Sequence, residues 1–334
     1  MDSLVEPAVP PSFTRTDFYG PIARDLAEVE RILRNSLDSD RPRVGRLLGE
    51  LRQYEGKRLR PALLLLTARA CGDVTPAHHL LGAVVEMIHT ATLVHDDVLD
   101  GASVRRHAPT ANAAWGNQTS VLLGDYLFTH AFHLASTLGD VRACRIIGEA
   151  TNRVCEGEMQ QSMERGDLEL GEEEYLDIID GKTAELTACC CRLGALYSGA
   201  PPAVIDRLSR YGRSLGMAFQ IADDLLDLTG DEKCTGKSLG TDIEQQKMTL
   251  PLIRLLQKAP RDVGARLRQI LKSPGNHKRE SCRPFLADSD ALDYASKRAL
   301  EFAAEARTAL ECLPPSQCRL VLELLTDRVV HRNS

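Results

Sequence analysis

Apolar residues recur at steps of three and four along almost every long segment of this chain, and this period constrains the fold most. Ile22 to Leu37, Pro76 to Asp96 and Ala287 to Leu310 are examples. No segment alternates as a reliable β-strand would, and no repeat of fixed period is present. The sequence therefore predicts an all-α protein.

Most of the predicted helices are long and the connections between them are short. We therefore expect a single large antiparallel helical bundle around a central cavity, although 334 residues would allow two domains. Two of the long predicted helices are Thr110 to Leu138 and Glu172 to Tyr197. Gly230 to Thr241 contains three glycines and is predicted to be a loop, and Ser273 to Pro284 a long flexible one.

The two ends of the chain are expected to differ. Residues 1–20 carry several prolines and neither a basic nor an apolar leader region, so they are predicted to form a mobile arm before a helical domain at 21–334. The longest apolar run, Ala62 to Leu66, is too short for a transmembrane segment.

Net charge and cysteine usage limit the binding partners and the compartment that we expect. A net charge of −6 argues against a general nucleic-acid or anionic-membrane binder. Ten cysteines without a C-x-x-C pair suit small buried thiols in a reducing cytoplasm better than a disulfide or zinc framework.

An acidic cluster follows an almost uncharged helix. Asp96, Asp97 and Asp100 form the pattern D-D-x-x-D, and the first and last share one helical face. Like charges at that spacing repel, so stability alone does not favour the arrangement. A bound Mg²⁺ would reverse the sign of this interaction, because Mg²⁺ takes one or two carboxylates together with substrate phosphates. Taken alone, the cluster is better read as solvated acids at a helix end.

The same pattern occurs a second time, 127 residues later, as Asp223, Asp224 and Asp227. In an antiparallel bundle the two sets could face one cavity from opposite walls. They would then hold a small group of Mg²⁺ ions with a diphosphate between them.

Basic residues are grouped near both sets. Lys and Arg side chains are the phosphate ligands that such a site would need. The groups are Lys57-Arg58-Arg60, Arg105-Arg106, Lys182, and Lys237 with Lys247. Each group alone could be a solvated basic turn, but together with the aspartates they favour a diphosphate site.

These residues resemble a known family. The motifs are GKRLRP, HTATLVHDDVLD followed by two arginines, GDYLF, Lys182-Thr183, FQIADDLLD and K-x-x-G-x-D from Lys237. In this order they resemble the trans-isoprenyl diphosphate synthases (polyprenyl synthetases), from about Arg24 to the C-terminus. Glu55 departs from the family pattern, which usually has glycine there.

The resemblance implies an isoprenoid synthase fold, a homodimer and a role for each site residue. Six aspartates would act at the Mg²⁺ cluster: Asp96, Asp97, Asp100, Asp223, Asp224 and Asp227. Arg105, Lys182 and Lys237 would contact the allylic diphosphate, with Lys247 beside them, and Thr183 and Gln220 would line the reaction centre. Lys57, Arg60, His89 and Arg106 would bind isopentenyl diphosphate, whereas Arg58 would not be a direct ligand.

The resemblance also implies a mechanism. Mg²⁺ and the basic side chains would stabilise the departing diphosphate of farnesyl or geranylgeranyl diphosphate. The alkene of isopentenyl diphosphate would attack the allylic carbon, and a proton would leave to the released diphosphate.

Product length is expected to depend on the helix before the first aspartates. Ala91 and Thr92 are small, Ile88 and Met87 follow one turn further back, and no aromatic residue blocks this stretch. We therefore expect a long-chain all-trans product. The alternatives are a geranylgeranyl diphosphate synthase, a subunit of a heteromeric synthase, and a class I terpene cyclase, which would not explain Lys57 and Arg60.

Overall fold

The computed structural model describes residues 18–54, 56–105, 108–230, 239–274 and 277–331. Most of these residues are helical, so the all-α prediction is confirmed. Among them the strands are two short ones, β1 (Val104–Arg105) and β2 (Ala108–Pro109), which pair antiparallel with Arg105 opposite Ala108.

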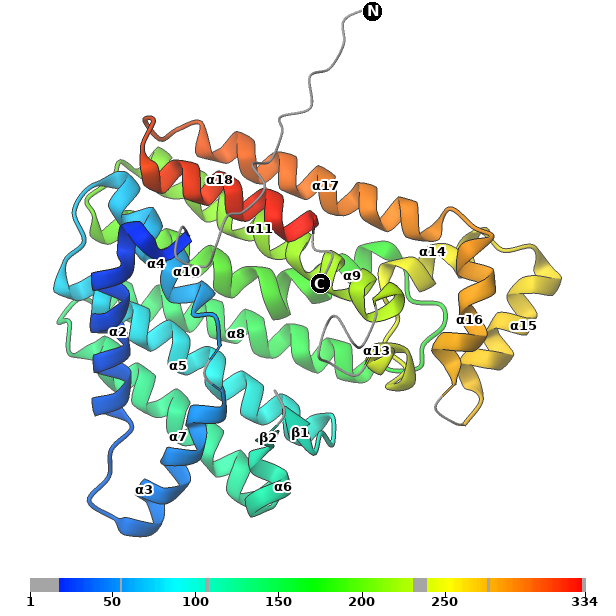
Figure 1. The fold of residues 1–334 in the computed structure, drawn as a ribbon, viewed down its shortest axis with the longest axis horizontal. Coiled ribbons are helices and arrows are strands. Elements are labelled where there is room, and N and C mark those ends of the chain that lie inside the picture. The colour runs from blue at the N-terminus through cyan, green and yellow to red at the C-terminus, as the bar shows by residue number, and fades with distance from the viewer. Residues whose placement is uncertain (1–17, 55, 106–107, 231–238, 275–276, 332–334) are drawn as a thin grey trace, which may run out of the picture.

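The helices form one elongated bundle (Figure 1). The first half of the chain contains η1 (Gly20–Ile22), α2 (Ala23–Ser36), α3 (Pro42–Gly49), η2 (Glu50–Tyr54), α4 (Leu59–Cys71), α5 (Pro76–Leu99), α6 (Ala111–Trp115), α7 (Asn117–Ser136) and α8 (Val141–Met163). The second half contains α9 (Glu172–Ile179), the π-helical turn η3 (Asp180–Ala184), α10 (Glu185–Tyr197), α11 (Pro202–Thr229), α13 (Thr241–Glu244), α14 (Leu250–Lys258), α15 (Arg261–Lys272), α16 (Lys278–Ala287), α17 (Ala291–Leu310) and α18 (Gln317–Val330).

The centre of the bundle is formed by α4, α5, α10 and α11. Leu63 to Leu66 of α4 are completely buried, which explains why this helix is apolar on nearly every side. Gly194 of α10 lies so close to α4 that an added Cβ would stand 2.4 Å from the carbonyl oxygen of Leu64. The close approach of these two backbones therefore depends on a residue without a side chain.

The long helix α11 joins the two parts of the core. Leu208 and Tyr211 of its first half belong to the same apolar cluster as residues of α4, α5 and α10, whereas Ile221 and Leu228 of its second half belong to the cluster of α9, α14 and α17. In Figure 1, α11 and α17 lie side by side along the upper edge. This continuity supports one bundle over two separate folding units.

Three local expectations were wrong. The predicted helix from Thr110 to Leu138 is interrupted at Gly116, whose φ of 82° is outside the helical region. The predicted flexible loop from Ser273 to Pro284 overlaps α16, which begins at Lys278 and is anchored by the buried Cys282. Phe18, assigned to the arm, is buried and lies 5.1 Å from the guanidinium of Arg328.

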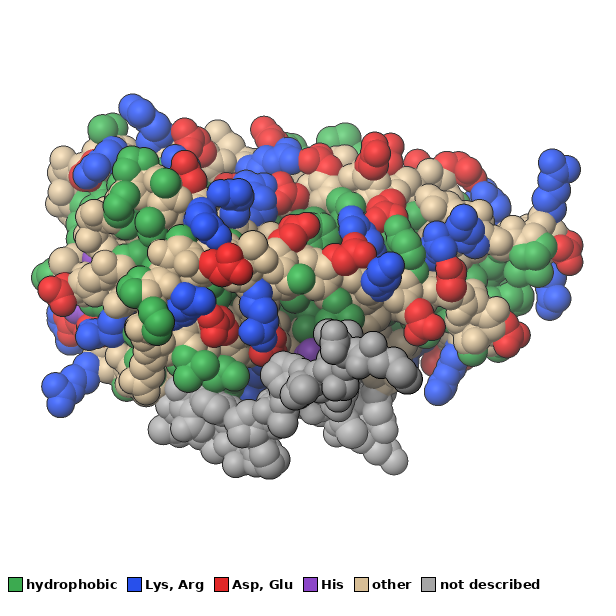
Figure 2. Space-filling model, turned by 90° about the horizontal axis from the view of Figure 1, so that it is seen from above, with side chains coloured by type: hydrophobic (Ala, Val, Ile, Leu, Met, Phe, Trp, Pro, Cys, Tyr) green, Lys and Arg blue, Asp and Glu red, His purple; other side chains and the backbone are tan. Residues whose placement is uncertain are grey.

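The surface carries charges of both signs. On the face seen in Figure 2, Lys and Arg side chains are interspersed with Asp and Glu. No helix among the described residues is long and apolar enough to cross a membrane.

Candidate active site

The first aspartate set lies where α5 ends. A capping box between Thr75 and His78, with Pro76 at the first position, starts this helix, and Asp100 caps its C-terminus. Acidic side chains at a helix C-terminus are unfavourable because they face the negative end of the helix dipole. The cluster is therefore placed against the local preference of the helix, as is common for residues kept for function.

Asp97, the second aspartate of the set, is buried and fully engaged. It is 1% exposed, its Oδ2 accepts a 2.7 Å hydrogen bond from the Tyr54 hydroxyl, and its Oδ1 accepts one of 2.9 Å from Arg105 Nε. The same Tyr54 oxygen accepts the backbone N–H of Ala111 at the start of α6. This arrangement favours a supporting role for Asp97 and Arg105 over direct contact with metal or diphosphate.

Asp96 and Asp100 face a different group of side chains. Burial raises the pKa of Asp96 to about 6; the charge of Lys182 opposes this, and the charges of Glu158 and Asp100 add to it. Burial would raise the pKa of Asp100 as well, but the charge and hydrogen bond of Lys247, with Arg165, lower it. Lys182 forms an ion pair with Glu158 and donates a 2.9 Å hydrogen bond to Gln161.

The second aspartate set repeats the arrangement of the first. Asp224, its second member, is 4% exposed and accepts a 2.7 Å hydrogen bond from Tyr175. Its other oxygen accepts one of 2.8 Å from Gln220, which in turn accepts one from the Thr183 hydroxyl. In both sets, then, a tyrosine hydroxyl holds the second aspartate in a buried position.

Asp227 and Asp242 connect the second set to the first. Asp227 accepts hydrogen bonds from the Asp242 N–H and from the N–H and hydroxyl of Thr241. Lys247 Nζ lies 3.1 Å from Asp100 and 3.9 Å from Asp242. Burial raises the pKa of Asp242 to about 6, with contributions from Asp227 and Asp223 and an opposing one from Lys247. Lys247 therefore joins the first aspartate set to Asp242, the hydrogen-bond partner of Asp227.

A π-helical turn carries Lys182 and Thr183. Such turns are rare and often occur at functional sites. Here α8 lies directly against the turn: a Cβ on Gly157 would stand 2.5 Å from the Lys182 backbone nitrogen. The predicted helix Glu172 to Tyr197 is thus continuous but changes its winding at the site.

The segment before α4 carries a second group of cations. Arg60 Nε is buried and has no hydrogen-bond partner among the described residues, so it could still take an anionic ligand. Lys57 is exposed, and its carbonyl oxygen accepts the Tyr19 hydroxyl. Arg58 instead points to Glu86 of α5, at 2.9 Å. His89 lies one turn after Glu86 and is partly buried.

The donor set fits Mg²⁺. Among the described residues no three Asp, Glu, His or Cys side chains form a ready metal cage. Mg²⁺ does not require one, because it commonly binds one or two carboxylates, waters and substrate phosphates. Burial and the like charges of Glu158 and Asp100 raise the pKa of Asp96 and so disfavour its ionised form. A bound cation would stabilise that ionised form.

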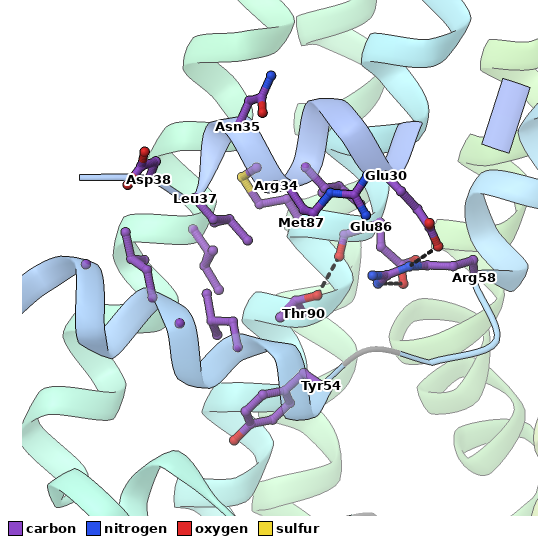
Figure 3. Close-up of a pocket in the computed structure, with 16 residues that line it drawn as sticks. Glu30, Arg34, Asn35, Leu37, Asp38, Tyr54, Arg58, Glu86, Met87 and Thr90 are labelled. Carbon is purple, nitrogen blue, oxygen red and sulfur yellow. Dashed lines mark hydrogen bonds and ion pairs between the residues drawn. The ribbon is translucent and has the colours of Figure 1, made fainter. Parts of the chain in front are cut away.

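The expected chain-length residues on α5 have different surroundings. Ala91 and Ile88 are completely buried in the core, and the Thr92 hydroxyl bonds to the His89 carbonyl oxygen. Met87 instead lines a cavity of about 370 Å³ between α2, α3 and α5. Figure 3 shows this cavity, with Tyr54 and Thr90 on one side and Glu86 and Arg58 on another.

Two expected ligands, Arg106 and Lys237, lie outside the described residues. Other site residues were not expected from the sequence: Tyr54, Glu158, Arg165, Tyr175 and Asp242. Only Asp242 had a signal, as the last residue of K-x-x-G-x-D. The isolated tyrosines and Glu158 belong to no pattern whose spacing would have marked them.

The chain is similar to known proteins over most of its length. A family model described as polyprenyl synthetase matches residues 42–287. An all-trans-nonaprenyl-diphosphate synthase (geranyl-diphosphate specific) of Rhodobacter capsulatus is 37% identical, over 95% of this chain and 98% of that protein. An octaprenyl diphosphate synthase of Escherichia coli is 36% identical, over 93% and 97%. A crystal structure of polyprenyl synthase from Caulobacter crescentus, complexed with calcium and isoprenyl diphosphate, has a TM-score of 0.90 and 36% identity, over 98% and 100%.

Proposed function

This chain belongs to the polyprenyl synthetase family, and on that premise we propose that it condenses isopentenyl diphosphate with an allylic prenyl diphosphate. The product is a long-chain all-trans polyprenyl diphosphate, as the relatives' names indicate for those proteins. The observation that carries the proposal is that Lys247 joins Asp100 of the first acidic set to Asp242, which donates its N–H to Asp227 of the second set.

The allylic diphosphate binds between the two sets. Mg²⁺ would be held by Asp96 and Asp100 on one wall and Asp223 and Asp227 on the other, and when bound it would neutralise the leaving diphosphate. Lys182 is suited to the same anion, because the charges of Asp96 and Glu158 raise its pKa despite burial and keep it protonated. Asp97 and Asp224 hold the two walls in place through Tyr54 and Tyr175.

Isopentenyl diphosphate binds at the other group of cations. Lys57, Arg60 and His89 are its ligands, together with Arg106. The Nε of Arg60 is buried and has no hydrogen-bond partner in the part of the chain that the structure describes, which supports this assignment, since a diphosphate oxygen would satisfy it. Thr183 and Gln220, hydrogen-bonded at 2.8 Å, lie beside the reacting carbons.

The proposal extends to assembly and setting. Large apolar side chains are exposed along α7 and α8, and a homodimer would cover them; they are Val121, Leu122, Val141, Met159 and Met163. The nine described cysteines are all free thiols, which supports a reducing cytoplasm.

A direct assay tests the function. The purified chain is incubated with Mg²⁺, isopentenyl diphosphate and geranyl, farnesyl or geranylgeranyl diphosphate in turn, and the products are sized. We expect products longer than geranylgeranyl diphosphate. No elongation of any primer would refute the proposal, and a geranylgeranyl product alone would refute its long-chain part.

A further inference from the structure

We infer that Arg58 is a positioning residue for the isopentenyl diphosphate site, because it keeps the Glu86 carboxylate from capturing Arg60. The inference rests on the proposed function. It assigns a role to the one basic residue of GKRLRP that is not expected to touch substrate.

Arg58 contacts two acidic side chains, one on α5 and one on α2. Its Nη1 lies 2.9 Å from Glu86 Oε1, and its Nε lies 3.8 Å from Glu30 Oε1 on α2. The side chains of Arg58 and Glu86 are 11% and 5% exposed. Figure 3 shows the three side chains converging at one edge of the cavity, with Arg58 between the two acids.

Glu86 is a buried acid that needs a cation. A carboxylate with so little access to water is costly unless a positive group compensates it. Two arginines are near enough to do so, because the charge of Glu86 also acts on Arg60 and counteracts the lowering of the Arg60 pKa by burial. Glu86 accepts its hydrogen bond from Arg58 Nη1, and Arg60 Nε has no hydrogen-bond partner among the described residues.

The backbone points to the same conclusion. Arg58 has a φ of 53° and a ψ of 36°, a left-handed conformation that is uncommon for a residue with a side chain. It immediately precedes α4, and its carbonyl oxygen accepts the Ala62 N–H in the first turn. Such a conformation persists only where the surroundings hold it, and the contact with Glu86 provides that hold.

The consequence for substrate binding follows from charge. If Arg58 lost its positive charge, Glu86 would remain buried and would turn to Arg60, on which its charge already acts. Arg60 would then be partly neutralised before a diphosphate arrived. Removing the charge of Glu86 as well would release Arg60 again, so the second substitution should repair part of the first.

The test compares Michaelis constants for the two substrates. With Mg²⁺ present, we expect Arg58→Met to raise the KM for isopentenyl diphosphate at least about tenfold while the KM for the allylic primer changes less than about twofold. The double variant Arg58→Met with Glu86→Gln should recover at least about threefold of that loss. Arg34→Met is the matched control, because Arg34 lines the same cavity without contacting Glu86; it should leave both constants unchanged.

Each other outcome overturns the inference. An unchanged KM for isopentenyl diphosphate, equal rises for both substrates, or a double variant as poor as Arg58→Met would each show that Arg58 does not act through Glu86 on Arg60. Isothermal titration with isopentenyl diphosphate in the absence of primer measures its binding independently of turnover. Thermal melting checks that each variant is folded. A wild-type chain without condensation would instead refute the proposed function, which separates the two failures.

Discussion

The hydroxyl of Tyr54 donates a 2.7 Å hydrogen bond to the buried carboxylate of Asp97, and Tyr175 and Asp224 repeat this bond at the same length on the opposite wall. The two tyrosines come from unrelated elements, η2 and α9. In each D-D-x-x-D set, the second aspartate is thus the structural member. We propose that the first and last members bind metal and substrate.

Tyr54→Phe should therefore destabilise the fold. The substitution removes a donor from buried Asp97 and an acceptor from the Ala111 N–H, and we expect a loss of about 1–3 kcal/mol in the free energy of unfolding. Urea denaturation measures it. Tyr294→Phe is the control, because Tyr294 also donates to a carboxylate, Glu172, but at a partly exposed site. Equal losses for the two variants would contradict the role assigned to Asp97.

Asp96→Asn and Asp97→Asn should separate chemistry from stability. Asp96 faces the like charges of Glu158 and Asp100, so Asp96→Asn should leave the melting temperature unchanged or higher. Its turnover should fall more than tenfold, a loss above about 1.4 kcal/mol of barrier stabilisation. Asp97→Asn should lower the melting temperature instead, because Arg105 loses its charged partner. Asp96→Asn with nearly full turnover would exclude Asp96 from the metal site.

Stabilisation by Mg²⁺ should depend on pH. Burial raises the pKa of Asp96 and of Asp242 from 3.8 to about 6, so the ionised carboxylates disfavour the folded state. The free energy of unfolding of the metal-free protein should therefore fall as pH rises from about 4 to about 6 and then level off.

Mg²⁺ with inorganic diphosphate must displace these protons. The rise in melting temperature that they cause should be larger at about pH 7.5 than at about pH 5, and smaller in Asp96→Asn at the higher pH. Thermal melting with and without the metal measures both effects. The same rise at both pH values would mean that neither carboxylate binds the cation.

Ala91→Phe should shorten the product. Ala91 is completely buried five residues before Asp96, so a phenyl ring would fill space on the expected path of the growing chain. Overpacking should also cost about 1–3 kcal/mol of stability. Met87→Phe is the comparison, because Met87, one turn before Ala91, is among the residues that line the cavity between α2, α3 and α5. If Met87→Phe alone shortened the product, the chain would run through that cavity instead.

The sequence predicted the helices and both acidic sets because period and spacing are local properties. It could not predict which acids are buried, because that depends on Tyr54 and Tyr175, two isolated residues brought in by tertiary packing. Arg105 was expected to contact diphosphate. It lies on β1, which pairs with β2, and it forms an ion pair with Asp97; no sequence pattern indicated this strand pair. The α16 helix was missed because Pro284 and the charged residues outweigh its few apolar positions.

The π-helical turn at Asp180–Ala184 limits which insertions and deletions this chain can tolerate. A π-turn contains one residue more than the α-helical turn it replaces, and each helical residue advances the side chains by about 100°. Deleting one residue there would rotate α10 against α9 and swing Gly194 away from Leu64. The turn thus sets the rotation of α10 about its axis relative to α9. An insertion or deletion on either side of the turn should therefore not be tolerated.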